Sequence, residues 1–598
     1  MQRSAIAGRI GRPTRTGIIH ASLAAFAVAL VVRSAYLQIW QGDDWEKKAL
    51  RQHFVTEDVP AARGDIFDAS LAPLAQSREM VGLSVAPSEL ADRRAAARAL
   101  AKLGVSKQWI ARATDRRRAW VTLPGRFLPG DAGPLAEMRG VYARAVFERV
   151  YTQRKATRRV IGSVDASGAA IDGLELVLDT LLRGRAGTAT LVRDAKGLRF
   201  QAPPDTAIAP RPGDNIVLTI NQELQEISEE ALARAAETMG AEGGDIVILD
   251  PHTGEIRAMA SRRLNPRSSG SPALSEPFEP GSTLKPFIAT ALLELQRATV
   301  DETVNTENGT YIMEGRRNPI TDTHKAESLT LEQVIRYSSN IGIVKLVQRL
   351  TPREEFETLR DFGFGTPTGV PFPSEAGGIL RAPRNWSRTS AASLAMGYEI
   401  AVTALQLASA YATFANGGEL LEPALIREVR SATGEVKFRH ERRVVRRVMG
   451  EKTARAVREM LVGTVEAGTA TRAGLGTFAL AGKTGTARRT AHGRYVANEY
   501  TASFVGLFPA NEPQYVILVK LDNPKGEYYG GLTAAPVTKA VLEAAIAARD
   551  AALDRRSLAR VESVHRQVAL GDVAPATSEQ ASLDVAYNGA GSVPYVLT

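Results

Sequence analysis

The N-terminal part of the chain contains a long apolar run. Residues 18–40 read IIHASLAAFAVALVVRSAYLQIW, and about 20 apolar residues are enough for a helix to span a bilayer. Arg33 lies toward the far end, where its long side chain can reach the interface. Tyr36 and Trp40 are typical of the aromatic belt at a membrane surface. The pattern predicts a single transmembrane helix over residues 18–40.

The residues before this run are basic. Arginines at positions 3, 9, 12 and 15 precede the first acidic residue, Asp43. Because basic flanks stay on the cytoplasmic side, residues 1–17 are expected to form a cytoplasmic tail, and the rest of the chain to lie at the periplasmic face of the cytoplasmic membrane. The alternatives are a cleaved signal peptide, which has the same basic start, and a buried helix of a soluble protein.

The next segment, residues 41–210, shows no sustained hydrophobic period. It contains a helix-like stretch, ADRRAAARALAKLG, and ends in QAPPDTAIAPRPGDN. Proline-rich segments of this kind are typical of domain junctions. We therefore predict a separate, irregular domain that ends near residue 210.

Residues 211–555 predict an α+β domain. NIVLTI is a short strand, and NQELQEISEEALARAAETMG has helical spacing that ends at a C-cap glycine. DIVILD and EIRAMAS are strand-like and joined by PHTG, a hairpin turn; TFALAGKTGTA, ASFVGLFPA and YVILVKLD are three late strands. VTKAVLEAAIAARDAALDRR closes the domain as an amphipathic helix. Strands at both ends with helices between them imply a mainly antiparallel sheet, and residues 556–598, small and polar, predict a disordered tail.

Composition narrows the function classes. Arginines are scattered along the chain although the formal net charge is +10, and no nucleic-acid-binding motif occurs, so no nucleic-acid partner is expected. A basic surface also suits anionic membranes and acidic polymers. The cysteine count is 0, which excludes disulfides and thiol chemistry. The histidines are scattered without an H-E-x-x-H motif, so neither a metal nor an organic cofactor is expected.

FEPGSTLKPF contains a candidate nucleophile and base, Ser282 and Lys285. If Pro280 and Gly281 introduce a helix, the two side chains lie one turn apart on one face. A serine hydroxyl needs a base to become a nucleophile, and a lysine amine can serve when burial or nearby cations lower its pKa. By itself this S-x-x-K spacing is more often a helix start with an exposed lysine.

RYSSNIG contains a second candidate, Ser338 and Asn340. The hydroxyl could relay a proton, and the amide could bind a peptide carbonyl of a substrate. Ser and Asn are also typical of helix caps and turns, which is the preferred interpretation of this motif in isolation.

AGKTGTA contains the third candidate, residues 483–486, in a predicted strand. Lys483 and Gly485 share one face, and Gly485 leaves room for a ligand to approach the backbone. The hydroxyls of Thr484 and Thr486 and the charge of Lys483 suit a substrate carboxylate. A sheet edge protected by a lysine is the alternative.

The three motifs become specific in combination. S-x-x-K, a Ser/Asn motif and K-T-G in this order are the signature of β-lactamases and penicillin-binding proteins. FEPGSTLKPF, YSSNIGIVKL, MGYEIAVTALQLASAYATFANGG and AGKTGTA resemble the transpeptidase domain of class B penicillin-binding proteins. RGDIFDASLAPLA and DGLELVLDTLLRGRAG resemble the pedestal, or dimerisation, domain of that class. The phrases F-E-P-G-S, S-S-N-x-G and K-T-G-T-A are most similar to the cell-division (septal) type.

The resemblance implies a fold and a reaction. The fold is a five-stranded antiparallel sheet flanked by helices, carried by an elongated pedestal. The reaction is transpeptidation, in which Ser282 is acylated by a D-Ala-D-Ala stem peptide and the acyl group passes to a neighbouring amine. Lys285 would be the general base, Ser338 and Lys483 would move protons, and the substrate would be bound by Asn340, Thr484, Gly485 and Thr486. The backbone N–H groups of Ser282 and Thr486 would form the oxyanion hole.

The resemblance also implies partners. These are peptidoglycan stem peptides on a lipid-linked precursor polymer, β-lactams as covalent inhibitors, the membrane, a polytopic septal glycosyltransferase and other division proteins. Two departures, DASL after Asp68 and a missing proline in YTQRKATRRVIG, fall in the pedestal. The alternatives are an elongation-type transpeptidase, a β-lactamase, a bifunctional penicillin-binding protein, a β-lactam sensor and a non-catalytic division scaffold.

Overall fold

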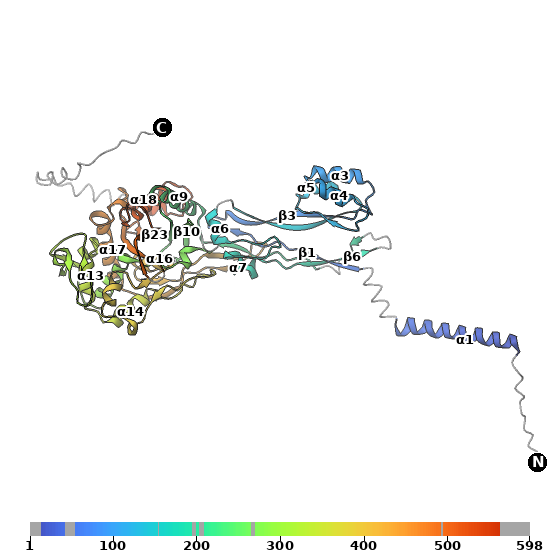
Figure 1. The fold of residues 1–598 in the computed structure, drawn as a ribbon, viewed down its shortest axis with the longest axis horizontal. Helices are drawn as coiled ribbons and strands as arrows, with labels where there is room; N and C mark the ends of the chain where they lie inside the picture. The colour runs from blue at the N-terminus through green and yellow to red at the C-terminus, as the bar shows by residue number, and fades with distance from the viewer. Residues whose placement is uncertain are drawn as a thin grey trace, which may run out of the picture.

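The computed structural model is an elongated molecule with a globular part at one end and α1 at the other (Figure 1). Its described residues are 14–41, 54–152, 155–193, 199–201, 208–264, 270–491 and 494–561. The predicted tail beyond residue 561, most of residues 1–17 and part of the proline-rich junction therefore lie outside the described residues.

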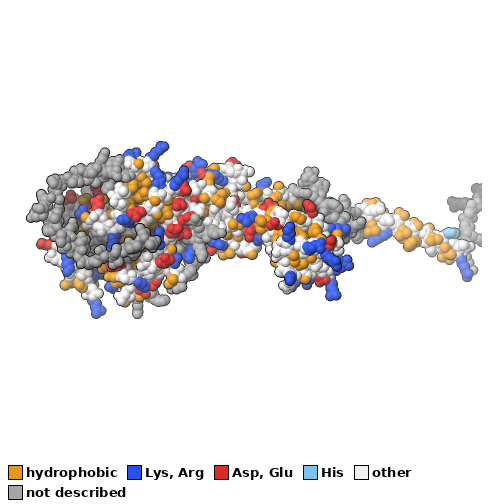
Figure 2. All heavy atoms as spheres, turned by 90° about the horizontal axis from the view of Figure 1, so that it is seen from above, with side chains coloured by type: hydrophobic (Ala, Val, Ile, Leu, Met, Phe, Trp, Pro, Cys, Tyr) orange, Lys and Arg blue, Asp and Glu red, His pale blue; other side chains and the backbone are white. Residues whose placement is uncertain are grey.

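The apolar run forms a helix, as predicted. α1 (Arg15–Ala35) continues into a short π-helical turn, η1 (Tyr36–Trp40). Within the described residues it is the one helix long and apolar enough to cross a membrane, and no part of its apolar window is buried by protein. Apolar side chains cover its surface in Figure 2. The helix is therefore compatible with a single-pass membrane anchor.

The pedestal consists of long antiparallel strand pairs. β3 (Pro73–Val85) pairs along its length with β5 (Val141–Tyr151), and β1 (Phe54–Val59) pairs with β6 (Gly187–Arg193). Figure 1 shows two arms, one of which ends in α3 (Arg93–Lys102), α4 (Lys107–Thr114) and α5 (Pro129–Ala136). This region is more regular than its sequence pattern suggested. Exposed and buried positions do not alternate strictly along β3, so its sequence lacks the two-residue period of a half-buried strand.

An ion-pair cluster joins the two pedestal motifs. Arg63, from RGDIFD, lies 2.5 Å from both Glu175 and Asp179, which belong to DGLELVLD. Arg149 of β5 lies 2.8 Å from the other oxygen of Glu175. Because Glu175 is fully buried, these arginines are needed to compensate its charge.

One sheet connects the pedestal with the globular part. Within the described residues its strand order is β19-β18-β8-β2-β3-β4, with β5 beside β3. The other strands are β2 (Ile66–Phe67), β4 (Val121–Thr122), β8 (Asn215–Leu218), β18 (Ile426–Arg430) and β19 (Val436–Arg439). β8 pairs with pedestal strand β2 on one side and with β18 on the other. Strands from both sides of residue 210 thus belong to one sheet. The domain boundary predicted near residue 210 stays a prediction.

The globular part contains the predicted five-stranded antiparallel sheet. Within the described residues its order is β10-β9-β23-β22-β21. These strands are β9 (Gly243–Leu249), β10 (Ile256–Arg263), β21 (Ala481–Ala491), β22 (Arg494–Phe508) and β23 (Tyr515–Asp522). α9 (Gln222–Met239) and α18 (Ala534–Ala547) pack on one side, and α11 (Lys285–Glu294) and α16 (Ala404–Ala415) contribute to the other core cluster. The fold is therefore the α+β arrangement expected.

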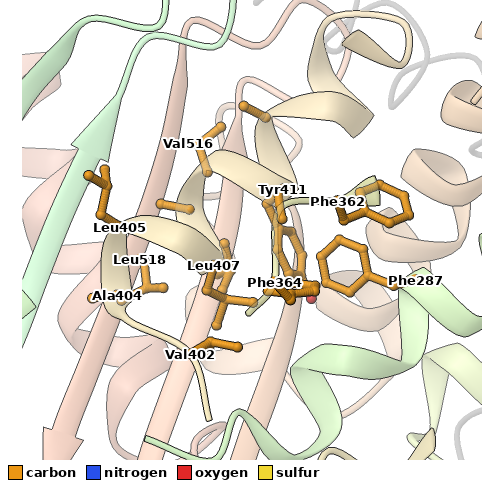
Figure 3. Packing of buried hydrophobic residues seen from close by; sticks show 14 of the residues in the cluster. Phe287, Phe362, Phe364, Val402, Ala404, Leu405, Leu407, Tyr411, Val516 and Leu518 are labelled. Carbon is orange, nitrogen blue, oxygen red and sulfur yellow. The ribbon is translucent and has the colours of Figure 1, made fainter. Parts of the chain in front are cut away.

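Aromatic packing fixes the base of α11. Phe287 makes edge contacts with Phe362 and Tyr411, at ring-centroid distances of 4.7 and 5.2 Å (Figure 3). The hydroxyl of Tyr411 donates a 2.6 Å hydrogen bond to the carbonyl of Thr283. The core thus holds the turn that carries Ser282. The other helices of this lobe are α12 (Leu331–Arg336), α13 (Asn340–Val347), α14 (Pro352–Asp361), α15 (Ser390–Ala395) and α17 (Glu451–Ala467).

The end of the domain differs from the prediction. The expected closing helix stops at Ala547, where the next residue is extended, and the chain then turns so that Asp550 accepts a hydrogen bond from Asn221. A further helical segment follows, and its Leu558 and Val561 are buried in the core cluster beneath α9 and α18. The first residues of the predicted disordered tail are therefore packed.

Candidate active site

Two glycines allow the turn of Ser282 to approach strand β21. Ser282 lies in the 3₁₀ turn η3 (Gly281–Leu284), directly before α11. Gly281 has φ +57°, a conformation that suits glycine. A Cβ on Gly485 would lie 2.6 Å from the carbonyl oxygen of Pro280. The space beside Gly485, expected to admit a ligand, is thus occupied by the turn that presents Ser282.

Lys285 is fully buried one helical turn after Ser282. Its Nζ donates to the carbonyl oxygen of Ser338 at 2.6 Å, to Ser338 Oγ at 3.2 Å and to Asn340 Oδ1 at 2.8 Å. Burial lowers the pKa of Lys285 to about 7, although the carboxylate of Asp322 acts in the opposite direction. An amine with such a pKa is partly neutral near pH 7 and can accept a proton.

The S-x-N motif forms the turn that enters α13. Ser339 caps the helix by accepting a hydrogen bond from the N–H of Gly342 at 2.8 Å. Ser338 has φ +59°, which is uncommon for a residue other than glycine. The motif therefore caps a helix and also contacts Lys285. The proton relay by Ser338 and the substrate binding by Asn340 stay predictions.

Lys483 lies beside this cluster on β21 and is also fully buried. Burial and the neighbouring Lys285 lower its pKa well below the usual lysine value. Within the described residues, neither Lys285 nor Lys483 lies within 4.0 Å of a carboxylate oxygen. Lys285 therefore favours the neutral amine of Lys483, as burial does.

The hydroxyls of the K-T-G-T segment face an open cavity of about 650 Å³. Thr484 Oγ1 lies 2.8 Å from Thr469 Oγ1, and Thr486 Oγ1 accepts a 3.0 Å hydrogen bond from the N–H of Gly530. The cavity is lined by Ser282, Ser338, Asn340, Thr484 and Thr486 together with Thr321, Tyr337, Tyr398, Arg488, Tyr500, Tyr528, Tyr529 and Gly531, among others. The structure thus brings the three sequence motifs together around one cavity.

Several residues in the cavity wall or behind it were not predicted. Tyr500 and Tyr528 stack at 4.2 Å and form an aromatic wall. Thr469 and Asp322, which contact Thr484 and the S-x-N turn respectively, lie in segments without a recognisable motif. The position of these residues depends on tertiary packing, so the local sequence carried no signal for them.

The glutamates nearest the motifs have other partners. Glu279 accepts hydrogen bonds from the N–H of Glu399 and the hydroxyl of Tyr495, and burial raises its pKa. Glu332 pairs with Arg336 at 2.8 Å. Among the described residues that line the cavity there is no glutamate or aspartate.

Comparisons with known proteins agree with this geometry. The Penicillin binding protein transpeptidase domain family matches residues 244–543, and the Penicillin-binding Protein dimerisation domain family matches residues 58–218. The chain belongs to the penicillin-binding protein transpeptidase family, and the presence of both domains places it in class B. It is a peptidoglycan D,D-transpeptidase.

Individual relatives cover almost the whole chain. The probable peptidoglycan D,D-transpeptidase PbpC of Pseudomonas aeruginosa is 31% identical over 87% of this chain and 93% of its own. The peptidoglycan D,D-transpeptidase FtsI of Escherichia coli is 30% identical over 86% of this chain and 88% of its own. A crystal structure of penicillin-binding protein 3 from Mycobacterium tuberculosis in complex with aztreonam is similar, with 27% identity and a TM-score of 0.62 over 81% of this chain and 96% of that one.

Proposed function

We propose that the chain cross-links peptidoglycan by serine acyl transfer, with Ser282 as nucleophile and Lys285 as its general base. The observation that carries this proposal is the environment of Lys285, which is fully buried, one turn from Ser282, and hydrogen-bonded to Ser338 and Asn340. A lysine that lacks a carboxylate partner is disfavoured as a cation and is suited to accept the serine proton.

The first half-reaction acylates the enzyme. Lys285 accepts the hydroxyl proton as Ser282 Oγ attacks the carbonyl carbon between the two terminal D-alanines of a stem peptide. The backbone N–H groups of Ser282 and Thr486 stabilise the oxyanion. The C–N bond breaks, Ser338 and Lys483 deliver a proton to the leaving nitrogen, and D-alanine departs.

The second half-reaction transfers the acyl group. The amine of a neighbouring stem attacks the ester carbonyl, loses a proton to the same basic groups and releases Ser282 with its hydroxyl restored. Asn340 holds the substrate amide, while the hydroxyls of Thr484 and Thr486 bind the substrate carboxylate. Gly485, predicted to admit the substrate, instead makes room for the turn that carries Ser282. The absence of a carboxylate among the described cavity-lining residues supports transfer to an amine over hydrolysis.

The test is covalent labelling by penicillin, which mimics acyl-D-Ala-D-Ala. A brief pulse of a fluorescent penicillin followed by intact-mass measurement should show one adduct on Ser282 that persists for minutes or longer. Ser282→Ala should remove the adduct, and Thr283→Ser, a conservative change beside it, should retain it. Rapid return to the unmodified mass with excess hydrolysed drug would identify a hydrolase instead.

We also propose a division role, supported by the resemblance of F-E-P-G-S, S-S-N-x-G and K-T-G-T-A to the cell-division type. Its partners would be a septal glycosyltransferase and other division proteins. Depletion should give filamentous cells that grow without dividing, whereas round, swollen cells would indicate the elongation type.

The proposed orientation places residues 1–17 in the cytoplasm and the catalytic domain at the periplasmic face. Support comes from the basic residues before α1. Protease added to intact spheroplasts should degrade the chain beyond Gln41 and leave a small membrane fragment. Protection of the large domain would contradict this orientation.

A further inference from the structure

A single carboxylate lies against the turn 338–341. Asp322 follows the short strand β13 (Ile320–Thr321), and it is 8% exposed. Its Oδ2 accepts a short hydrogen bond from Ser339 Oγ. Its Oδ1 accepts from the backbone N–H groups of Asn340 at 2.6 Å and Ile341 at 3.1 Å. Three consecutive residues are therefore held by one side chain.

The held turn is conformationally strained. Ser338 precedes these three residues and has φ +59°, a conformation that persists in a residue other than glycine only where the surroundings enforce it. In this conformation its carbonyl oxygen and its Oγ both accept hydrogen bonds from Lys285. The Asn340 side chain is fixed from the other side, where Nδ2 donates to the carbonyl oxygen of Thr321 at 3.0 Å.

The same carboxylate acts on Lys285 electrostatically. Among the described charged groups, Asp322 favours the protonated amine of Lys285, and Lys285 disfavours the charge of Lys483 and lowers its pKa. Asp322 makes no ion pair within 4.0 Å in the described part of the chain. Its charge is balanced by hydrogen bonds from neutral donors and by the nearby lysines.

We propose that Asp322 is a positioning residue for acyl transfer: its carboxylate fixes the turn 338–341 and thereby sets where the amine of Lys285 lies relative to Ser282. The inference rests on the proposed role of Lys285 as base. Asp322 touches neither Ser282 nor the cavity surface, so it acts through the turn and through its charge. A misplaced base of this kind commonly costs about 10²-fold in rate.

The decisive variant is Asp322→Asn, tested in the full-length detergent-solubilised protein. Asparagine keeps the shape but loses the charge and one acceptor for Ser339 Oγ. The second-order rate constant for acylation by fluorescent penicillin should fall about 10- to 100-fold. The acid limb of its pH profile should also move to lower pH, because the charge that favours protonated Lys285 is gone. Ser339→Ala keeps that charge. It should slow acylation less and leave the acid limb of the pH profile at its wild-type pH.

Glu375→Gln is the matched control. Glu375 likewise accepts hydrogen bonds from one hydroxyl, Thr368 Oγ1, and from two backbone N–H groups, but away from the cavity. The Glu375→Gln variant should be acylated by penicillin at the wild-type rate. The inference is wrong if Asp322→Asn acylates within twofold of wild type, or if it is slowed equally at every pH. If Asp322→Asn does not fold, Ser339→Ala decides, since an unchanged rate there contradicts the inference. Failure of the wild type to acylate would instead contradict the proposed function.

Discussion

Two buried lysines of the same domain, Lys520 and Lys285, have opposite surroundings. Lys520 of β23 is 3% exposed, and its Nζ lies 2.7 Å from Asp245 and 3.0 Å from Asp522. Lys285 is equally buried, but its acceptors are a carbonyl, a hydroxyl and an amide oxygen. The comparison shows that the partner, not the burial, separates a structural cation from a candidate base.

The pKa of Asp245, the carboxylate partner of Lys520, shows the same difference. Burial alone would raise the pKa of Asp245, yet Lys520 and Arg263 outweigh burial and lower it below its usual range. Around Lys285, by contrast, burial dominates and brings the pKa to about 7. The ion pair therefore contributes to the integrity of the sheet, whereas the unpaired lysine keeps a proton-accepting state within reach of neutral pH.

The largest expected effect is on acylation by Lys285→Met. Methionine fills a similar volume but accepts no proton, so the acylation rate constant should fall by about 10²–10⁴-fold. The free energy of unfolding should change by less than about 2 kcal/mol, because the gain from removing a buried amine without an ion pair is offset by acceptors left without a donor. Stopped-flow labelling and urea unfolding measure the two quantities. Retention of more than a tenth of the wild-type rate would contradict the role of Lys285 as base.

The same substitution at the paired lysine should have the opposite outcome. Lys520→Met leaves Asp245 buried beside Arg263 alone, and breaking a buried pair typically costs about 3–5 kcal/mol of unfolding free energy. Acylation per folded molecule should stay within about threefold of wild type, because the amine of Lys520 is bonded to Asp245 and Asp522 and to no residue of the three motifs. A large loss of acylation in folded protein would show that the two regions are coupled.

Asn340→Ala should have a smaller effect than Lys285→Met. It removes one of the three acceptors of Lys285 and the bond to Thr321, but the base itself remains. We expect acylation to slow by about tenfold, corresponding to the loss of one hydrogen bond to a charged group. Asn385→Ala, on the 3₁₀ turn η5 (Pro383–Asn385) outside the cavity, is the control. A loss as large as that of Lys285→Met would mean that Asn340 is more than a positioning group.

The comparison also explains what the sequence could predict. The strands of the five-stranded sheet, including β21 with Lys483, follow from hydrophobic patterns, and the three motifs are local in sequence. The sequence does not distinguish the paired Lys520 from Lys285, because Asp245 lies 275 positions from its partner Lys520. Asp322 was missed for the same reason: ITDTH has no motif, and its contact with the turn 338–341 depends on the packing of β13 beside α13.

The smallest expected effect is a change in how stability depends on pH. Folding lowers the pKa of Lys285 to about 7, so between pH 7 and the ordinary lysine value near 10 the unfolded chain binds more protons than the folded chain. Stability therefore rises with pH across this window. The energetic cost of burying Lys285 is complete below pH 7 and disappears as the pH approaches the unfolded-state pKa.

Lys285→Met removes one such group, so its unfolding free energy should rise less steeply from pH 7 to pH 9, by up to about 1 kcal/mol per pH unit. Urea unfolding at pH 7, 8 and 9 measures the slope. Thr290→Val, a buried change on the same helix, removes no titrating group and should keep the wild-type slope. If Lys285→Met also keeps that slope, Lys285 remains protonated throughout and cannot be the base. The shift in slope would thus link the burial of this lysine directly to its proposed chemistry.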